Sequence, residues 1–388
     1  MNKRICVVTG SRAEYGVMYW LLHDLRADPE IDLQLIVTGM HLAPEFGLTV
    51  HEIEKDQFSI SRRVEMLLSS DSPSGIAKSI GLGVIGMSDA FEQLKPDFVL
   101  VLGDRFEILA AAQASLIHNI PLIHLAGGDT TEGAFDESIR HAITKMAHVH
   151  FVTNEESARR VRQMGEDSRY IHMVGSLGLD HLRRTALLDG VALEAALDAH
   201  LGTRNLLVTF HPVTLESGRA EEQFEELLAA LDALDHGVTL WFTRPNADTG
   251  GRSMSIALDQ WAATRSDRVH VFASLGQLRY LSLMVQVDAV VGNSSSGLYE
   301  APSFKVPTVD IGDRQRGRLA AQSVVHCDPT RESIVQAIDK AFAMDCRDVV
   351  NPYGDGETAG RIVKVLHSLP KAAVLLKKHF HMVESTLT

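Results

Sequence analysis

Cysteine is scarce in this chain, with only Cys6, Cys327 and Cys346 among 388 residues. Three widely spaced cysteines cannot form a disulfide framework or a zinc motif. So little cysteine is typical of a reducing compartment, and we expect a cytoplasmic protein. Residues 1–4 lead directly into a strand-like run with no small-residue cleavage site, so we expect no signal peptide.

Long apolar runs and a surplus of basic residues are lacking as well. No apolar run approaches the roughly 18 residues that span a bilayer, so we expect no membrane partner. Asp and Glu number 50 against 37 Lys and Arg, which gives a formal net charge of -13. A nucleic-acid-binding surface needs a basic patch, so no nucleic-acid partner is expected. An anionic ligand must instead be met by a local cluster of arginines and backbone N–H groups.

Common ligand signatures are also missing. No Gly-x-Gly-x-x-Gly follows a strand-like run and no Gly-x-x-x-x-Gly-Lys occurs, which disfavours dinucleotide-binding and P-loop NTPase assignments. The 18 histidines show no metal-ligand spacing such as His-Glu-x-x-His. We therefore predict neither a bound metal nor a cofactor.

The apolar residues that are present alternate between short β-branched runs and longer helical stretches. This alternation is typical of repeated βαβ units and a parallel sheet. The first set of expected strands covers residues 4–9, 33–37, 98–102, 122–124, 150–153 and 170–174. A second set covers residues 205–210, 238–243, 269–272, 289–291, 308–311 and 323–326.

The two sets of strands predict two Rossmann-like domains of an α/β protein that face each other across a cleft. We expect the first domain over residues 1–180 and a second, nucleotide-binding domain over residues 181–370. An Ala- and Leu-rich helical stretch at about 177–201 is expected to connect them. A helix over 357–369 and a C-terminal helix within 371–388 are expected to close the chain, the last one packing back on the first domain.

Polar motifs follow the expected strands at eight places and carry Gly, Asp, Arg, His or Ser. Such residues also occur as caps and turn formers, so one motif alone is a weak signal. Ligands of open parallel sheets bind outside the carboxyl ends of the strands, so a series of such motifs predicts a ligand site. The small residues at 10–12 and 292–297 suit phosphate binding through backbone N–H groups. The eight motifs cover residues 9–16, 38–41, 103–105, 125–141, 210–214, 243–251, 292–297 and 311–314.

The stretch 125–141 is the richest of these motifs, with four carboxylates, an arginine and a histidine directly after an apolar run. One interpretation is a catalytic loop. The other is a decorated helix surface, because Asp136/Arg140 and Glu137/His141 are both i,i+4 pairs.

Taken together and in this order, the motifs resemble the hydrolysing UDP-N-acetylglucosamine 2-epimerases of the sialic-acid and legionaminic-acid pathways, which are related to the non-hydrolysing bacterial 2-epimerases. The similarity covers essentially the whole chain. It implies the two-domain GT-B-type fold, a UDP-linked acetamido sugar as substrate, and a homodimer or homotetramer. The motifs that carry it lie at 10–16, 103–105, 136–145, 211–214, 293–297 and 312–315.

By this resemblance, Asp104, Asp136 and His211 hold catalytic positions, with Glu137 and Asp129 as further catalytic candidates. Taken singly, Asp104 also fits an Asx-turn residue and His211 a loop histidine beside Pro212. The resemblance further implies a set of substrate-binding positions, among them Arg12 for the diphosphate or uridine, Ser294 and Ser295 for phosphate, and Glu300 for the ribose. The whole set is Arg12, Tyr15, Gly16, His41, Arg105, Arg140, Arg244, Asn246, Asp248, Asn293, Ser294, Ser295, Ser296, Gly297, Glu300 and Arg314.

One position departs from the family pattern. Some relatives carry Glu where this chain has Ala126, and Asp129 stands where relatives usually have Glu. Three explanations stay open: the missing carboxylate is dispensable, Asp129 or Glu132 replaces it, or the substrate differs.

The implied reaction removes the proton from sugar carbon 2 as the nucleoside diphosphate leaves carbon 1, and water then adds to the resulting 2-acetamidoglycal. The expected substrate is UDP-N-acetylglucosamine, giving N-acetylmannosamine and UDP. The alternative is the same reaction on a UDP- or GDP-linked 2,4-diacetamido-2,4,6-trideoxyglucose. A GT-B glycosyltransferase and a non-catalytic nucleotide-sugar sensor are the remaining hypotheses.

Overall fold

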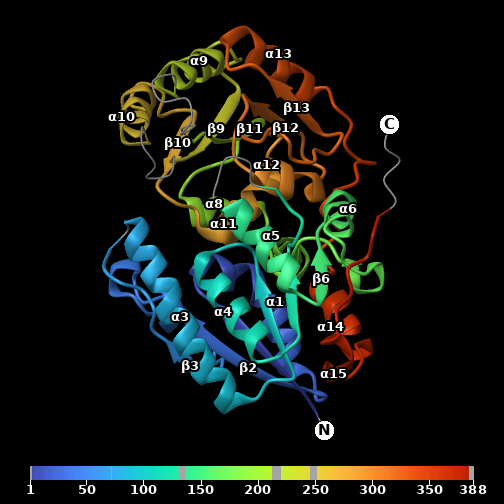
Figure 1. Ribbon diagram of the computed structural model, residues 1–388. Coiled ribbons are helices and arrows are strands. Elements are labelled where there is room, and N and C mark those ends of the chain that lie inside the picture. Colours follow the sequence, from blue (N-terminus) through green and yellow to red (C-terminus); the bar gives the residue numbers. More distant parts are fainter. Residues whose placement is uncertain (1, 71, 131–135, 212–219, 245–250, 384–388) are drawn as a thin grey trace. The chain divides into compact units, whose positions relative to one another are not determined.

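The computed structural model describes residues 2–70, 72–130, 136–211, 220–244 and 251–383 (Figure 1). The chain divides into two compact units, the first formed by residues 1–181 and 353–388 and the second by residues 182–352. Each unit is built on one parallel sheet. Within the described ranges, no helix combines the length and apolarity that crossing a membrane requires.

The first unit contains a seven-stranded sheet in the order β3-β2-β1-β4-β5-β6-β7. Its strands are β1 (Lys3–Thr9), β2 (Ile31–Thr38), β3 (Ile60–Val64), β4 (Phe98–Leu102), β5 (Leu122–Leu125), β6 (Val149–Val152) and β7 (Ile171–Met173). Its helices are α1 (Arg12–Ala27), η1 (Gly39–Leu42), η2 (Pro44–Phe46), α2 (Val50–Lys55), α3 (Pro73–Leu94), α4 (Phe106–Ile117), α5 (Asp136–Met146), α6 (Glu155–Gln163), η3 (Ser168–Tyr170), η4 (Leu177–Leu179), α14 (Thr358–Ser368) and α15 (Ala372–Leu375).

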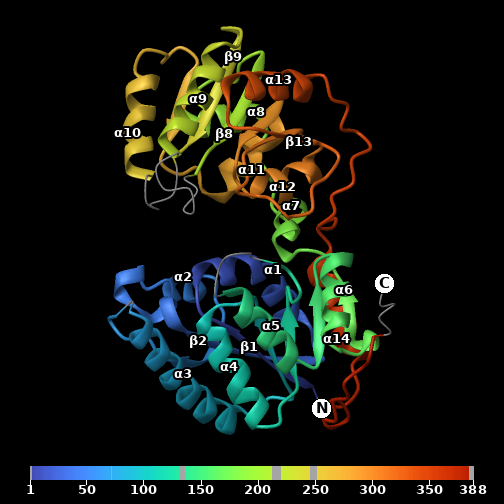
Figure 2. The same cartoon turned by 45° about the horizontal axis from the view of Figure 1, so that its top comes forward.

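Side chains of β1 alternate between two apolar layers, because successive residues of a strand point to opposite faces of the sheet. Ile5 and Val7 pack in one cluster with α1 and α14. Cys6 and Val8 pack in the other with α3, α4 and α5. Figure 2 shows α3 and α4 running side by side along one face of the sheet. The first unit is therefore a three-layer arrangement with helices on both faces.

The second unit repeats this plan with a six-stranded parallel sheet in the order β10-β9-β8-β11-β12-β13. Its strands are β8 (Arg204–Thr209), β9 (Val238–Thr243), β10 (Val269–Phe272), β11 (Ala289–Gly292), β12 (Thr308–Ile311) and β13 (Val324–Cys327). The remaining helices are α7 (Asp180–Arg184), at the boundary between the units, and α8 (Gly190–Leu197), α9 (Ala220–Asp232), α10 (Gly251–Ala262), α11 (Gly276–Gln286), α12 (Ser296–Tyr299), η5 (Ala301–Phe304) and α13 (Arg331–Phe342).

Two apolar layers again cover the sheet. Leu206 and Val208 pack with α9, α10 and α13, whereas Leu207 and Val290 pack with α8 and α11.

The two sheets share one strand order. In each sheet, the second and third strands in the sequence are added on one side of the first strand, and the later strands are added on its other side. The reversal falls between β1 and β4 in the first unit and between β8 and β11 in the second. Ligands of such sheets bind where the loops after the two central strands diverge.

Four features differ from the sequence-based expectations. β3 was not expected, because its exposed Arg62 and Arg63 interrupt the apolar run. The helix expected over 177–201 is divided into η4, α7 and α8, since the Asp189 side chain accepts the Ala192 N–H at 2.8 Å and begins a new helix there.

The end of the chain differs as well. The second domain was expected to reach residue 370, but residues 353–370 belong to the first unit. The N–H groups of Thr358 and Ala359 donate to the carboxylate of Asp180 at 2.8 and 2.7 Å. Of the helix expected within 371–388, only α15 forms among the described residues. The residues after it are held on the first unit by other contacts, including the His381 N–H to the Gly165 carbonyl at 3.0 Å.

Candidate functional site

At the carboxyl end of β4, Asp104 is held by an arginine from α5. The Nε of Arg140 donates to Oδ2 of Asp104 at 3.1 Å, and its Nη2 donates to the same oxygen. Only 11% of the Arg140 side chain and 19% of the Asp104 side chain are exposed. A charge-assisted pair so shielded from solvent fixes the position of the carboxylate.

Asp136, the first residue of α5, is a second carboxylate in the same cluster. Burial, followed by the negative charge of Asp104, raises the pKa of Asp136, while Arg105 and Arg140 act in the opposite direction. Asp136 therefore holds a proton more readily than an exposed aspartate. Two carboxylates in different electrostatic environments are the arrangement that separates a base from an acid.

Two buried glutamates that were not assigned a role from the sequence lie behind Arg105. Arg105 Nη2 and Nε donate to the carboxylate of the fully buried Glu107 at 3.0 and 3.2 Å. Glu14 accepts the Gly10 N–H at 2.7 Å, and its Oε1 has no hydrogen-bond partner among the described residues, although Arg105 Nε lies 3.9 Å away. Burial raises the pKa of Glu14 to about 8. Glu14 lies within the motif 9–16 and Glu107 follows the motif 103–105 by two residues, which is the signal that could have found them.

Four predicted substrate-binding residues, Arg12, Tyr15, Gly16 and His41, follow β1 and β2, and they differ in exposure. Arg12 is exposed and pairs with Glu52 at 3.2 Å. Tyr15 is buried and donates its hydroxyl to Asp56 at 2.6 Å. The backbone carbonyl of Gly16 accepts from His181 at 2.8 Å.

His41 is also internal. Its ring lies between the hydroxyls of Thr9, at 3.0 Å, and Thr49, at 2.8 Å. Burial lowers the pKa of His41 to about 4, so the ring is neutral at pH 7. The structure thus builds Tyr15 and His41 into the packing of the first unit and leaves Arg12 at its surface.

The turn after β5 carries the position that departs from the family pattern. Ala126 has a φ of +60°, in the left-handed region that few side chains adopt, and Gly128 has a φ of +79°. A Cβ on Gly128 would lie 2.4 Å from the carbonyl oxygen of Ser157, so only glycine fits there. The turn is thereby pressed against the start of α6.

Asp129, at the end of this turn, faces inward. Its Oδ1 accepts hydroxyl hydrogen bonds from Thr153 and Ser157, both at 2.6 Å. Burial raises the pKa of Asp129 despite these bonds. Glu132 lies outside the described residues. On α5, Glu137 pairs with His141 at 3.0 Å, the helical i,i+4 pair that the sequence offered as one interpretation.

In the second unit, the ends of β8 and β11 are joined by a reciprocal pair of hydrogen bonds. The His211 N–H donates to Oδ1 of Asn293 at 2.7 Å, and Nδ2 of Asn293 donates to the His211 carbonyl at 2.8 Å. Asn293 is 1% exposed. Its own carbonyl accepts from Arg314 at 3.0 Å and from Gln315 at 2.8 Å. Hydrogen bonds of the buried Asn293 therefore join three of the predicted loops, 210–214, 292–297 and 311–314.

Arg314 was also open to interpretation as half of an ion pair with Asp313. In the structure, Asp313 pairs with Arg316 at 3.1 Å, and Arg314 reaches the backbone of Asn293 instead. Arg244 forms an ion pair with Asp259 at 2.6 Å. Asn246 and Asp248 lie outside the described residues.

The serines after β11 form a chain of hydroxyl contacts. Ser294 Oγ lies 3.0 Å from Ser296 Oγ, which lies 2.6 Å from the hydroxyl of Tyr280. Ser295 precedes α12 as its N-cap. A Cβ on Gly297 would lie 2.5 Å from Cγ2 of Thr308, so this glycine allows α12 to pack closely on β12.

Glu300 follows α12. Burial raises the pKa of Glu300 to about 8, so this carboxyl is largely protonated at neutral pH and can donate a hydrogen bond.

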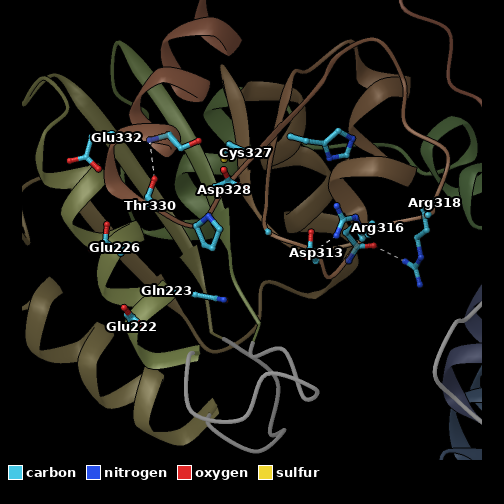
Figure 3. Close-up of a pocket in the computed structure, with 16 residues that line it drawn as sticks. Glu222, Gln223, Glu226, Asp313, Arg316, Arg318, Cys327, Asp328, Thr330 and Glu332 are labelled. Carbon is cyan, nitrogen blue, oxygen red and sulfur yellow. Dashed lines mark hydrogen bonds and ion pairs between the residues drawn. The ribbon is translucent and has the colours of Figure 1, made fainter.

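A cavity of 990 Å³ opens beside these loops within the second unit. Most of the side chains in its walls are polar or charged, and Figure 3 shows Glu222 and Glu226 from α9 facing the segment that carries Asp313, Arg316 and Arg318. The cavity was not predicted, because its lining combines α9 with the segments 312–318 and 326–333, which lie about 90 residues or more further along the chain.

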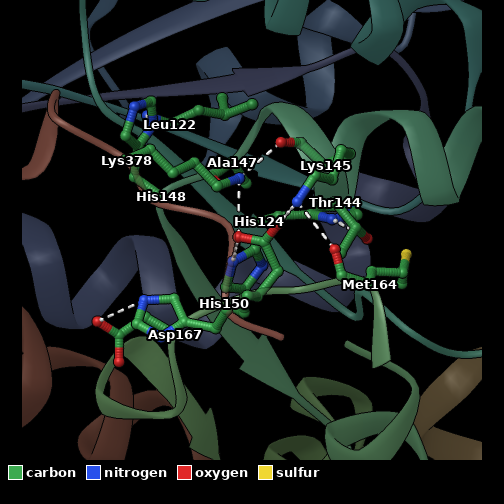
Figure 4. Close-up of polar contacts among 12 residues, drawn as sticks. Leu122, His124, Thr144, Lys145, Ala147, His148, His150, Met164, Asp167 and Lys378 are labelled. Atoms are coloured by element: carbon green, nitrogen blue, oxygen red, sulfur yellow. Dashed lines mark hydrogen bonds and ion pairs between the residues drawn. The ribbon is translucent and has the colours of Figure 1, made fainter. Parts of the chain in front are cut away.

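A second buried polar cluster, away from Asp104, holds the C-terminal segment. Glu166 is 1% exposed and accepts from Lys145 at 2.7 Å, Lys378 at 2.7 Å and His150 at 3.1 Å. In Figure 4 the amino group of Lys378 also reaches the carbonyls of Lys145 and Ala147, both at 2.6 Å. Burial alone would raise the pKa of Glu166, but the bonds from His150, Lys145 and Lys378 lower it to about 2. The cluster ties the C-terminal segment to α5 and β6 through one buried carboxylate, which indicates a structural role.

Two parallel-sheet α/β units with polar loops at their carboxyl edges define the GT-B-type class of fold, as predicted. The family model described as UDP-N-acetylglucosamine 2-epimerase matches residues 23–367, and the chain belongs to this family. The predicted resemblance is thereby confirmed, and the protein is an enzyme of the hydrolysing 2-epimerase family.

Two relatives and one solved structure illustrate the match. The chain is 42% identical over 343 residues to the GDP/UDP-N,N'-diacetylbacillosamine 2-epimerase (hydrolyzing) of Campylobacter jejuni, covering 88% of this chain and 87% of that protein. It is 36% identical to the UDP-N,N'-diacetylbacillosamine 2-epimerase (hydrolyzing) of Legionella pneumophila, covering 97% and 99%. The crystal structure of the Neisseria meningitidis UDP-GlcNAc 2-epimerase bound to UDP-GlcNAc superimposes with a TM-score of 0.76 at 18% identity, covering 94% and 100%.

Proposed function

We propose that this enzyme converts a UDP- or GDP-linked 2,4-diacetamido-2,4,6-trideoxyglucose and water into the free 2-epimeric sugar and the nucleoside diphosphate. The expectation of UDP-N-acetylglucosamine as the main substrate has less support, because the relatives at 42% and 36% identity are both named for diacetylbacillosamine substrates. Both sugars carry an acetamido group on carbon 2 and a nucleoside diphosphate on carbon 1. The same catalytic chemistry therefore serves either one.

The reaction imposes an order on its bond changes. No carbonyl acidifies the proton on carbon 2, so the bond between carbon 1 and the diphosphate oxygen must break ahead of proton removal and build oxocarbenium character. The bonding electrons leave with the nucleoside diphosphate, a base takes the proton, and the C–H electrons form the C1=C2 double bond of the glycal. Water then adds its hydroxyl to carbon 1, and a proton returns to carbon 2 on the opposite face.

The observation that carries the proposal is the carboxylate pair Asp104 and Asp136. Asp104 is held in place by Arg140 and suits the base, whereas Asp136, with its raised pKa, suits the group that returns a proton. Inversion at carbon 2 requires two groups that serve opposite faces of the ring. General acid–base catalysis of this kind accelerates a reaction by roughly 10²- to 10⁴-fold.

Anion stabilisation is assigned to the loops of the second unit. Arg314 and the backbone N–H groups of Ser294 and Ser295 suit the departing diphosphate. Each such donor is worth about 3 kcal/mol by analogy with oxyanion holes. His211, whose backbone Asn293 holds, is assigned as a proton donor or a phosphate partner.

The absence of a carboxylate at Ala126 is compatible with this scheme. The side-chain oxygen Oδ1 of Asp129 is engaged by Thr153 and Ser157, which argues against Asp129 as its replacement. Asp104 and Asp136 can divide the proton transfers without a third carboxylate.

The test is turnover in D₂O, followed by NMR of the free sugar and the nucleoside diphosphate, with the diacetamido substrate and UDP-N-acetylglucosamine compared side by side. We expect deuterium at carbon 2 of the released 2-epimer and a higher kcat/KM for the diacetamido sugar. Release of the nucleotide only when a non-water acceptor is added would instead indicate a glycosyltransferase. Tight binding without turnover of either sugar would indicate a sensor.

A further inference from the structure

An apolar pocket of 440 Å³ lies in the first unit beside Arg105. Its apolar side chains come from three segments: the loop after β2, the residues between β3 and α3 with the first turn of α3, and the start of α4. They are Met40, Phe46, Leu67, Leu68, Ile76 and Phe106. A pocket of this size and character is typical of small-molecule sites.

The pocket shares one wall with the carboxylate cluster. Arg105 lines the pocket and donates to Met40 Sδ at 3.7 Å, while its positive charge also acts on Asp136. Asp104 precedes Arg105 directly in the chain. A sugar ring that reacts at these carboxylates therefore has the apolar pocket within reach of its other substituents.

The pocket is open to a ligand, since two of its large apolar side chains are left on the surface. Phe46 is 51% exposed and Leu68 is 40% exposed. Their backbone is nevertheless fixed, because the Leu68 N–H donates to the buried Ser79 hydroxyl at 3.1 Å and the Phe46 N–H donates to the Ala43 carbonyl at 3.1 Å. Ser69 and Ser70 stand exposed at the rim and supply hydroxyls.

The two candidate sugars differ in the groups that such a pocket distinguishes. The diacetamido trideoxy sugar carries a methyl group at carbon 6 and an acetamido group at carbon 4, whereas N-acetylglucosamine carries hydroxyls at both positions. Methyl groups gain by leaving water for an apolar surface, whereas a hydroxyl loses its hydrogen bonds there. One or two methyl groups in an apolar pocket are worth a discrimination of roughly tenfold or more.

We propose that this pocket receives the carbon 6 methyl and the carbon 4 acetamido methyl of the substrate, and that Phe46 and Leu68 determine the preference for the trideoxy sugar. The amide of the acetamido group meets the serine hydroxyls at the rim. This assignment rests on the proposed function, because it names the part of that same site which selects the sugar.

The experiment measures kcat/KM for both UDP-sugars with the full-length wild type and with Phe46→Ala and Leu68→Ala. Both residues are exposed, so the variants are expected to fold. We expect each to lower kcat/KM for the diacetamido sugar about tenfold and to change that for UDP-N-acetylglucosamine less than twofold. Ile85→Ala, which removes a 63%-exposed side chain from α3 outside the pocket, is the matched control and should change neither.

The outcomes separate this assignment from the proposed function. A wild type that prefers UDP-N-acetylglucosamine overturns both. A wild type that prefers the diacetamido sugar, with variants that affect the two sugars equally, overturns the pocket assignment and leaves the proposed function standing. An equal loss would place the shared carbon 2 acetamido group, or the nucleotide, in the pocket.

Discussion

The guanidinium of Arg140 on α5 holds the carboxylate of Asp104 at the end of β4 by two hydrogen bonds to a single oxygen, Oδ2. Neither bond uses Oδ1. The arrangement orients Asp104 without occupying both of its oxygens, which is what a positioned base requires.

Asp104→Asn should therefore reduce turnover by about 10²- to 10⁴-fold while leaving nucleotide affinity nearly unchanged. The matched control is Asp97→Asn at the opposite end of the same strand, where Asp97 pairs with the half-exposed Arg4. That variant should retain activity. Steady-state kinetics and calorimetric titration with UDP measure the two effects, and near wild-type turnover of Asp104→Asn would falsify the assignment.

Glu14 should make the folded protein less stable as the pH rises. Burial raises the pKa of Glu14 from 4.5 to about 8 in the folded protein. The unfolded chain releases this proton at lower pH, so the stabilisation is complete below pH 4.5 and is lost as the pH rises through 8, by up to ~1.4 kcal/mol per pH unit.

Glu14→Gln should remove this dependence, because the amide keeps an acceptor for the Gly10 N–H and does not titrate. Urea unfolding at several pH values between 5 and 8 measures the slopes. Glu92→Gln, on an exposed position of α3, should reproduce the wild-type slope. Equal slopes for all three proteins would contradict the role given to Glu14.

Gly292 should not tolerate a side chain. Its φ is +137°, and a Cβ there would lie 1.9 Å from the carbonyl oxygen of Thr209. Gly292→Ala must therefore push β8 and β11 apart, next to the contact between His211 and Asn293. We expect a loss of more than about 3 kcal/mol in the free energy of unfolding, together with weaker UDP binding.

Gly360→Ala is the matched control for this change. Gly360 is exposed in α14 and an added Cβ would meet nothing within 4 Å, so alanine should stabilise the helix by up to about 1 kcal/mol. If both substitutions cost the same, backbone strain at Gly292 is not the cause.

Lys378→Met should loosen the C-terminal segment. It removes one of the three side chains that contact the Glu166 carboxylate, at a cost of about 1–3 kcal/mol in unfolding free energy. The neighbouring Lys377 is exposed, so Lys377→Met should stay within about 0.5 kcal/mol of the wild type. Limited proteolysis should cleave near the C-terminus faster in the first variant alone.

The Glu166 cluster should make the protein less stable as the pH falls. The lowered pKa of Glu166 contributes stability that is complete above pH 4.5 and is lost as the pH falls toward 2. Glu166→Gln should therefore lose much of this acid sensitivity, which urea unfolding between pH 3 and 6 measures. If Glu166→Gln loses stability between pH 6 and 3 as steeply as the wild type, other carboxylates cause most of the acid sensitivity.

The sequence predicted the strands that the sites depend on, because β1, β4, β8 and β11 are buried on both faces and read as continuous apolar runs. The sequence did not predict β3, because this edge strand has few apolar residues and carries Arg62 and Arg63. The loops at the carboxyl ends of these strands were predicted for the same reason, since a predicted strand also locates the loop that follows it.

Side-chain partners were harder to predict than positions. Spacing offered Asp136 as the i,i+4 partner of Arg140, but the structure pairs Arg140 with Asp104, 36 residues earlier in the chain. The local rule did hold for Glu137 and His141. Pairing across elements depends on how α5 lies against β4, which no local pattern encodes. The roles of the site residues, and the homodimer or homotetramer, stay predictions.

The return of residues 353–383 to the first unit has a consequence for synthesis on the ribosome. Lys3 Nζ donates to the carbonyl oxygens of Leu366 and Leu369, at 2.6 and 3.1 Å, so the first strand meets almost the last helix. The second unit is an insertion within the first, and it can complete its own core while the first still lacks α14. The apolar side of α1 that packs on α14 then stays uncovered until α14 has been synthesised, after the whole of the second unit. A nascent chain of this enzyme therefore carries an exposed hydrophobic surface while the second unit is made, which is the kind of surface that chaperones bind.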